Sequence, residues 1–463
     1  MKDAVSQASL PALASPSPNA ARPESAQEDR WYPSSSLRLL LGGLLWMSAA
    51  LAVCLPLTPK EMPSSLADDT FFPHARPTGP VVYAPQPEAP AQERRHASTE
   101  AERHFLRREH AVLNFLAPRL GLCAAAAMPS ATFTCVRRED PATRLPRYVC
   151  TGNGQGAPLR FAVALRQRLG REGRHARSAD GSPLFPQPLL PYLRWRDDGA
   201  LEVRSGDCVM MEIHFPGRER ELADLARPHP QPALIIVIDD MGQKMEAAGQ
   251  LAALPYPVTL AVWPHARHRG DTVRLARDMG LDVLAHIPME ALPGKDGRLP
   301  ATGPNALRVD MNEAQLRRAL NESLALLPEA IGFNNHMGSA LTSADGPCRV
   351  IARNEAGRGY FVLDSMTHPQ SRLFARCRQM GIVSAARSVF LDNTRRVPAI
   401  LANLSLAARK ARQYGSAIAI GHPYPETITA LQRWENLEGV AIVPLRRHIW
   451  RLSGAGLPDA VSP

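Results

Sequence analysis

The chain lacks the short motifs that identify several common classes of protein. No cysteine pair stands at zinc-finger spacing, no glycine-rich phosphate loop is present, and no Gly-x-Ser-x-Gly sequence surrounds a serine. Aromatic residues are not interleaved with basic ones as they are in RNA-binding motifs. These absences argue against a structural zinc finger, a P-loop enzyme, an elbow-type serine hydrolase and nucleic acid as a partner.

Lysine is also scarce. The formal net charge of +10 comes almost entirely from arginine, because the 463 residues include only five lysines. Arginines outnumber acidic residues between 94 and 227, and this surplus could attract an anionic envelope polymer, lipid headgroups or nucleic acid. The alternative is an ordinary solvated surface in an arginine-biased proteome.

One long apolar run lies near the N-terminus. Residues 39–57 carry no charge, and as a helix they would be about 28 Å long, close to the thickness of the bilayer core. A cleaved signal peptide is the alternative, but a long polar segment precedes the run and no clean Ala-x-Ala site follows it. We predict an uncleaved anchor over 37–57 in the inner membrane, with the bulk of the chain in the periplasm.

The segments on either side of this run, and the C-terminal end, have little to bury. Residues 1–36 are polar and rich in alanine, serine and proline, which predicts disorder. Residues 58–100 are rich in proline, which predicts a semi-extended linker that can reach on the order of 100 Å. Residues 453–463 are predicted to be a tail.

Seven cysteines are present, and six of them follow the predicted anchor. Cysteines in an exported region can form disulfides. Because Cys135 and Cys150 bracket a plausible hairpin, we predict a disulfide between them.

Residues 101–227 have the pattern of a small α+β accessory domain. Apolar residues at helical spacing begin at Phe105, and a second helix is expected over 159–169. Strands are expected over 132–136, 147–151, 193–196, 200–203 and 208–215. An Asp-Asp-Gly turn joins the third and fourth of these strands into a hairpin.

Residues 231–452 alternate between short apolar runs and amphipathic stretches. Strands are expected near 233–240, 258–263, 282–287, 331–335, 360–364, 389–391, 416–421 and 440–444. Helices are expected near 243–253, 268–279, 311–327, 345–357, 370–380, 398–414 and 426–436. Seven or eight βα units in this length predict an α/β fold, a distorted (β/α) barrel.

The first of these strands ends in two adjacent carboxylates, Asp239 and Asp240. Two buried acids repel each other, so a cation or a shared proton must compensate. A metal ligand beside a general base is one solution. A pair of acids that caps the following helix is the other.

Four further apolar runs end in chemically capable side chains, namely those of His286, His336, Asp364 and His422. A single histidine after a strand is commonly a structural hydrogen-bonding residue. Five strands that all finish in aspartate or histidine are harder to explain in that way. Because the carboxyl ends of the strands meet at one face of a (β/α) barrel, we predict that these side chains form one active site.

Seven ordered segments over residues 231–446 resemble the divergent polysaccharide deacetylases, distant relatives of the NodB-homology carbohydrate esterases. These segments are VIDDMG, PVTLAVWPHA, AHIPME, GFNNHMGS, FVLDSMT, VFLDN and AIAIGHPYPET. The resemblance covers just under half of the chain. It implies a distorted (β/α) barrel and metal-dependent hydrolysis of an N- or O-acetyl group on a glycan.

The resemblance also implies roles for the residues at the strand ends. Asp239 would be the general base, Asp240 a metal ligand, His422 the general acid, and Asp364 an acid that orients a partner. His286 occupies the first position of the metal-binding histidine pair of the superfamily. The implied cofactor is a divalent metal, with Zn²⁺ as the first choice.

The second position of that histidine pair departs from the pattern, because Glu290 stands there. Glutamate can ligate zinc. However, Pro288 and Met289 predict an extended turn after His286, so we prefer His336 as the third metal ligand.

Three polar residues near these ligands have no single implied role. Asn334 and Asn335 stand where the superfamily has an Arg-x-Pro-Tyr motif, and they could orient ligands or bind substrate, as could Glu290. Trp263 and His265 follow the second strand and could line a sugar groove or simply pack in a loop.

Three functions are consistent with these observations. The first is a metal-dependent deacetylase that acts on an envelope or extracellular polysaccharide. The second is a catalytically degenerate relative that binds a glycan or an envelope protein partner. The third is another metallohydrolase activity, such as amide cleavage in peptidoglycan.

Overall fold

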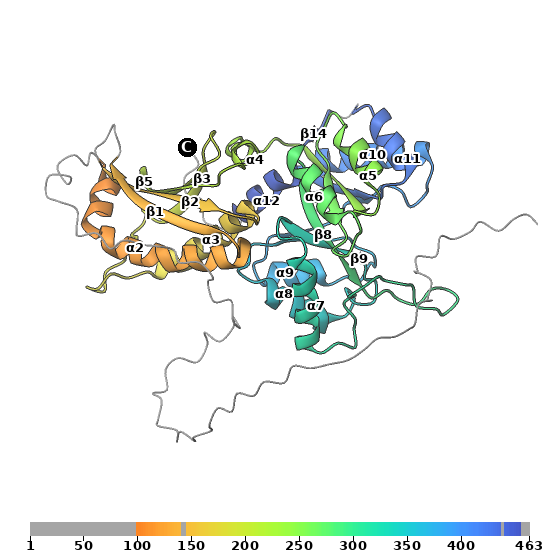
Figure 1. The fold of residues 1–463 in the computed structure, drawn as a ribbon, viewed down its shortest axis with the longest axis horizontal. Coiled ribbons are helices and arrows are strands. Elements are labelled where there is room, and N and C mark those ends of the chain that lie inside the picture. The colour runs from red at the N-terminus through yellow and green to blue at the C-terminus, as the bar shows by residue number, and fades with distance from the viewer. Residues whose placement is uncertain (1–98, 140–144, 437–438, 455–463) are drawn as a thin grey trace, which may run out of the picture. The chain divides into compact units, whose positions relative to one another are not determined.

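The computed structural model describes residues 99–139, 145–436 and 439–454 (Figure 1). The predicted disordered arm and membrane anchor lie outside these residues, as does almost all of the proline-rich linker. All described residues belong to one compact unit. The predicted boundary between an accessory domain and a barrel therefore stays a prediction.

The N-terminal part contains a five-stranded sheet and two long helices. The strands are β1 (Thr132–Glu139), β2 (Pro146–Asn153), β3 (Pro191–Trp195), β4 (Leu201–Ser205) and β5 (Cys208–His214), in the order β1-β2-β5-β4-β3. Neighbours run antiparallel except for β2 and β5. The predicted hairpin between β3 and β4 is confirmed.

Helix α2 (Glu100–Ala127) begins with a capping box, in which Thr99 and Glu102 each accept a hydrogen bond from the other's backbone N–H. By length and composition, it is the one helix among the described residues that could cross a membrane. Its apolar side nevertheless packs into the protein core together with helix α3 (Pro158–Glu172). The helix is therefore explained as a core element.

The predicted disulfide between Cys135 and Cys150 is confirmed, and it joins directly paired residues of β1 and β2. Four other cysteines are buried free thiols, namely Cys123, Cys208, Cys348 and Cys377.

The C-terminal part contains a curled parallel sheet. Its strands are β6 (Ala233–Met241), β7 (Thr259–Val262), β8 (Asp282–Met289), β9 (Gly332–Met337), β10 (Phe361–Asp364), β11 (Ser384–Ala386), β12 (Val389–Phe390), β13 (Ser416–Gly421) and β14 (Ala441–Ile442). The order is β11-β10-β9-β8-β7-β6-β13-β12, with β14 on β6. This arrangement agrees with the predicted strands and with a (β/α) barrel of the deacetylase type.

Helices connect these strands. They are α5 (Met245–Ala252), α6 (Arg269–Asp278), α7 (Glu313–Ala325), α8 (Asp345–Glu355), α9 (Leu373–Gln379), α10 (Val397–Tyr414), α11 (Pro425–Arg433) and α12 (Leu445–Gly454). Figure 1 shows α5, α6, α10 and α11 on one side of the sheet and α7, α8 and α9 on another. Strand β11 and helix α12 were not predicted. Strand β8 continues through Pro288 and Met289, so the predicted turn there was wrong.

A single segment joins the two ends of the sheet. Strands β11 and β12 are the first and last in the strand order, yet only two residues separate them in sequence. The backbone N–H of Arg387 donates to Asp364 on β10 (2.9 Å), and that of Ser388 donates to Ile418 on β13 (2.8 Å). The segment thus pairs first with one edge and then with the other.

Both faces of the curled sheet are buried, which explains the unbroken apolar sequence of β6. Leu234 and Ile236 pack in one cluster with residues of the surrounding helices. Ile235 and Val237 point to the opposite face and belong to a second cluster, which also contains Phe161 of α3. One hydrophobic core therefore joins the inner face of the parallel sheet to the N-terminal helices.

Candidate active site

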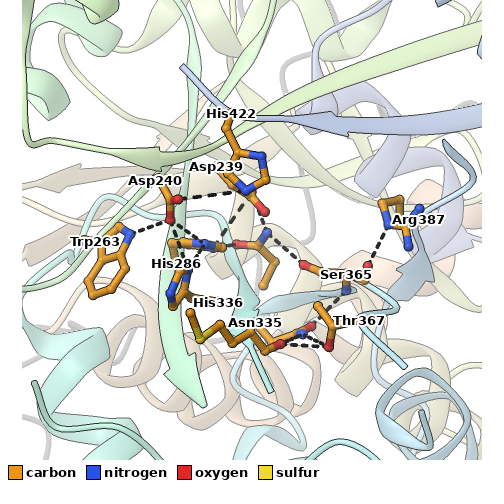
Figure 2. A network of polar contacts seen from close by, with 12 residues as sticks. Asp239, Asp240, Trp263, His286, Asn335, His336, Ser365, Thr367, Arg387 and His422 are labelled. Atoms are coloured by element: carbon orange, nitrogen blue, oxygen red, sulfur yellow. Dashed lines mark hydrogen bonds and ion pairs between the residues drawn. The ribbon is translucent and has the colours of Figure 1, made fainter. Parts of the chain in front are cut away.

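The carboxyl ends of four strands of the curled sheet bring the predicted site residues together (Figure 2). Asp239 and Asp240 lie near the end of β6, His286 on β8 and His336 on β9. His422 directly follows β13, which pairs with β6. The predicted convergence of these five residues agrees with the distances between their side chains.

Three side-chain atoms form a nearly equilateral triangle. Asp240 Oδ1 lies 3.2 Å from His286 Nε2 and 3.0 Å from His336 Nδ1, and the two nitrogens lie 3.1 Å apart. A circle through these three atoms has a radius of about 1.8 Å, slightly less than the roughly 2.0–2.2 Å of zinc–nitrogen and zinc–oxygen bonds. One carboxylate oxygen and two imidazole nitrogens at this spacing fit a divalent metal ion.

Asn334 fixes which nitrogen of His286 points into the triangle. Its amide nitrogen donates to Asp239 Oδ1 (2.7 Å), because a carboxylate can only accept. Its amide oxygen therefore faces His286 Nδ1 (2.9 Å), which must carry the hydrogen. His286 Nε2 is left as the atom available to a metal, as in metal sites where an outer partner sets the histidine tautomer.

The backbone at Asp240 departs from regular strand geometry, and this departure sets the direction of the side chain. The pairing of β6 with β7 shifts register between Ile238 and Met241, as at a β-bulge. Asp240 has φ of 56°, and Met337, directly after His336, has φ of 51°. Non-glycine residues with such angles are strained and cluster at functional sites.

The charges of this cluster shift the pKa values of its members. Burial raises the pKa of Asp239. Burial would also raise the pKa of Asp240, but hydrogen bonds and charges from His286 and His336 outweigh it and hold that pKa well below the usual range.

The histidines shift in opposite directions. Burial would lower the pKa of His286, but the charge of Asp239 and the contacts with Asp240 raise it to about 9. Burial lowers the pKa of His336 despite its bond to Asp240. The protein thus places one positive charge among its acids, where a metal cation would take the place of the proton.

His422 is oriented by an acid that the sequence interpretation did not include in the site. Asp392 Oδ1 lies 3.0 Å from His422 Nδ1, and Asp392 Oδ2 accepts from the His422 backbone N–H and from the Thr427 hydroxyl. Burial would lower the pKa of His422, but the hydrogen bond to Asp392 and the nearby acids raise it. The other ring nitrogen, Nε2, lies 3.8 Å from Asp240 Oδ2 and faces the site.

Two predicted site residues, Asp364 and Glu290, use their carboxylates in hydrogen bonds outside the metal triangle. The carboxylate of Asp364 accepts hydrogen bonds from the Ser371 hydroxyl and from the backbone of Met366 and Phe374. Glu290 accepts a hydrogen bond from the Val309 backbone (2.7 Å). The metal triangle contains neither residue. Their predicted roles in catalysis and substrate binding stay predictions.

The two predicted substrate-binding asparagines are buried, with 0% and 1% of their surface exposed for Asn334 and Asn335. Asn335 accepts a hydrogen bond from the Ser365 backbone and donates to the Met337 carbonyl. Both amides are used to hold neighbouring strand ends in place. This arrangement favours the orienting role over substrate contact.

From the sequence, Trp263 could line a sugar groove or pack in a loop, and in the structure it contacts the candidate metal site directly. Its indole N–H donates to Asp240 Oδ1 (2.7 Å). Trp263 and Asp392 each follow a short strand, as the predicted residues do. An aspartate or tryptophan after a strand can serve so many purposes that this position alone does not assign a role.

Comparison with known proteins agrees with the geometry. Residues 236–449 match the family model for divergent polysaccharide deacetylase. The uncharacterized protein YibQ of Escherichia coli is 34% identical over 225 residues, covering 47% of this chain and 69% of YibQ. An uncharacterized protein of Haemophilus influenzae is 33% identical over 226 residues, covering 48% of this chain and 78% of that protein.

A solved structure is also similar. The crystal structure of an uncharacterized protein from Agrobacterium tumefaciens C58 aligns with a TM-score of 0.45 and 24% sequence identity. The alignment covers 49% of this chain and 94% of that protein.

Proposed function

The chain belongs to the divergent polysaccharide deacetylase family, and from this premise we propose that it is a metal-dependent hydrolase that removes acetyl groups from an envelope or extracellular polysaccharide. The observation that carries the proposal is the triangle of Asp240, His286 and His336, with Asp239 and His422 beside it. A general base and a general acid that flank a metal site are the groups that hydrolysis of an acyl group requires.

The proposed ligands are Asp240, His286 and His336, and Zn²⁺ is the proposed ion. When bound, such an ion lowers the pKa of a coordinated water and polarises a carbonyl oxygen. Asp239 is the proposed general base, because burial raises its pKa and so strengthens its affinity for a proton. Asn334 holds one oxygen of Asp239, which leaves the other oxygen as the proposed proton acceptor.

His422 is the proposed general acid. Its Nδ1 is paired with Asp392, so a proton on Nε2 faces the site and can pass to the departing amine or alkoxide of the sugar. The hydrogen bond to Asp392 raises the pKa of His422, which favours the protonated form of the ring before the step. The two proposed proton-transfer groups, Asp239 and His422, are fixed by separate amide and carboxylate partners.

We propose a periplasmic or extracellular location. The disulfide between Cys135 and Cys150 suits an oxidising compartment, where such bonds persist. A family defined by action on polysaccharide suits the same compartment, because envelope glycans lie outside the cytoplasm. Anchoring through residues 37–57 in the inner membrane, and an envelope protein partner, stay predictions.

The full-length chain tests the proposal in two measurements. Purified protein should contain about one divalent ion per chain and should release acetate from N- or O-acetylated envelope glycans. Asp239→Asn should keep the ion but lower kcat by about 10²–10⁴-fold, because it removes only the base.

Two results would contradict this function. A metal-free protein with an intact fold would favour the glycan-binding or protein-binding alternative. Stoichiometric metal with no acetate release from any acetylated glycan would favour another metallohydrolase activity.

A further inference from the structure

Trp263 contacts the candidate metal site with both its N–H group and its ring. The indole N–H donates to Asp240 Oδ1, the same oxygen that lies near both histidine nitrogens (Figure 2). The indole ring centroid lies 4.4 Å from that of His336 and 6.2 Å from that of His286. One side chain therefore touches each of the three proposed ligands.

The main chain of Trp263 is fixed to the bulge that carries Asp240. Its backbone N–H donates to the Met241 carbonyl (3.1 Å), and its own carbonyl accepts from Ala266 (3.1 Å). These bonds hold the residue directly after β7, beside the irregular end of β6. The position of the indole relative to Asp240 is thus set by backbone as well as side-chain contacts.

A glycine from a different segment lies close to the six-membered ring of the indole. Gly303, in the connection between β8 and α7, has φ of +92°, and a Cβ placed on it would lie 2.3 Å from Cζ3 of Trp263. Only glycine allows the backbone to lie this close to the ring. The indole is therefore in close contact with both this connection and His336.

We propose that Trp263 is a positioning residue for the metal centre. Its N–H occupies one lone-pair direction of Asp240 Oδ1 and so restrains rotation of the carboxylate, while its ring limits the movement of His336. The indole N–H is a neutral donor, so it orients the carboxylate without cancelling the negative charge that binds a cation. An arginine or lysine at this place would compete with the metal.

The role rests on the proposed function, since it requires that the triangle binds a metal. Hydrogen-bonding partners outside the ligands themselves typically contribute 10–100-fold to metal affinity. Trp263→Phe keeps an aromatic ring and removes the N–H. In the full-length chain, we expect this variant to bind Zn²⁺ about 10–100-fold more weakly, measured by competition with a chromophoric chelator.

The chain offers a matched control for the indole N–H. Trp434 is also buried, and its Nε1 has no hydrogen-bond partner among the described residues. Trp434→Phe should therefore leave the Zn²⁺ affinity unchanged. Equal affinities in the wild type and in Trp263→Phe would overturn the positioning role.

The glycine contact allows a second test that keeps the N–H group. Gly303→Ala should displace the indole and weaken Zn²⁺ binding. Gly297 lies in the same connection with φ of +74°, but a Cβ there would meet nothing within 4 Å. Gly297→Ala carries similar backbone strain and should leave the affinity unchanged. Equal effects of the two alanines would overturn the contact argument.

An NMR measurement on metal-free protein separates this inference from the proposed function. The chain has six tryptophans, and the indole signal missing from Trp263→Phe identifies Trp263. Asp240→Asn should shift that signal because it weakens the acceptor. An unchanged signal would overturn the hydrogen bond. Absence of metal from the purified wild type would overturn the proposed function. The change in the Trp263 indole signal would still show whether Trp263 donates a hydrogen bond to Asp240.

Discussion

Glu212 in the five-stranded sheet and Asp239 in the curled sheet are both buried, but their charges are compensated differently. In the five-stranded sheet, Glu212 lies 3.0 Å from Arg147 and 2.9 Å from Arg196, both permanently charged. In the curled sheet, Asp239 and Asp240 receive hydrogen bonds from the uncharged groups of Asn334 and Trp263. The first arrangement neutralises its acid with permanent charges, whereas the second offsets its acids with the proton of His286, which a metal cation can replace.

The partners distinguish Glu212 from the proposed catalytic acid Asp239 more clearly than burial does. Glu212 and Asp239 are exposed to similar extents, 4% and 3%. Glu212 is paired with arginines and Asp239 with an amide. These partners determine whether the carboxylate is available to bind a metal ion or a proton. The comparison can be tested by changing one acid, or the residue that positions it, in each sheet.

The largest expected effect concerns Asp240. Asp240→Ala removes the oxygen that lies close to both proposed histidine ligands and should lower Zn²⁺ affinity by at least about 100-fold. The bound metal of purified full-length protein measures this loss. Retention of a full equivalent of metal would show that the triangle is not the metal site.

The matched change in the other sheet should affect stability and not metal. Glu212→Gln leaves Arg147 and Arg196 without their shared carboxylate, and it should lower the free energy of unfolding by about 2–3 kcal/mol. Chemical denaturation measures the change. Altered Zn²⁺ binding at unchanged stability would contradict the distinction between the two sheets.

A smaller effect is expected from the acid that orients His422. Asp392→Asn keeps the size of the side chain but weakens the bond that holds Nδ1. We expect kcat for acetate release to fall about 10–100-fold, while the metal content stays at the wild-type value. A variant with full turnover would show that His422 needs no orienting partner, or that it is not the acid.

The smallest predicted effect concerns His448, which has no acidic partner among the residues that the structure describes. Burial and the nearby charges of Arg451 and His229 lower the pKa of His448 to about 3, from about 6.5 in the unfolded chain. Protonation therefore favours the unfolded state, and the contribution of neutral His448 to stability is lost as pH falls below 6.5 towards 3.

His448→Gln should make the pH dependence of unfolding shallower by about 1 kcal/mol per pH unit within that window. Denaturation series at several pH values measure the slope. Identical slopes for the variant and the wild type would show that His448 does not titrate in this range.

The metal triangle could be predicted from sequence because parallel strands bring their carboxyl ends to one edge. Asp240, His286 and His336 each end an apolar run, and the order of the strands places them together. The same rule placed Asp364 in the site, but its carboxylate turns into the loop that follows β10. Strand-end position does not determine the direction of a side chain.

The positioning residues could not be assigned for a related reason. The tautomer of His286 depends on how the amide of Asn334 is turned, and that follows from its bond to Asp239. The indole of Trp263 donates to Asp240 at the point where β6 bulges after Ile238. These relations arise from local backbone irregularities, which the period of apolar residues does not reveal.

The two residues between β11 and β12, Arg387 and Ser388, lie close to groups that hold the proposed general base, Asp239. The guanidinium of Arg387 holds the Ser365 carbonyl, the Ser365 hydroxyl accepts from Asn334, and Asn334 binds Asp239. An insertion after Arg387 would not change any residue of the candidate active site. It would nevertheless loosen the proposed general base, because Ser365 and Asn334 link Arg387 to Asp239.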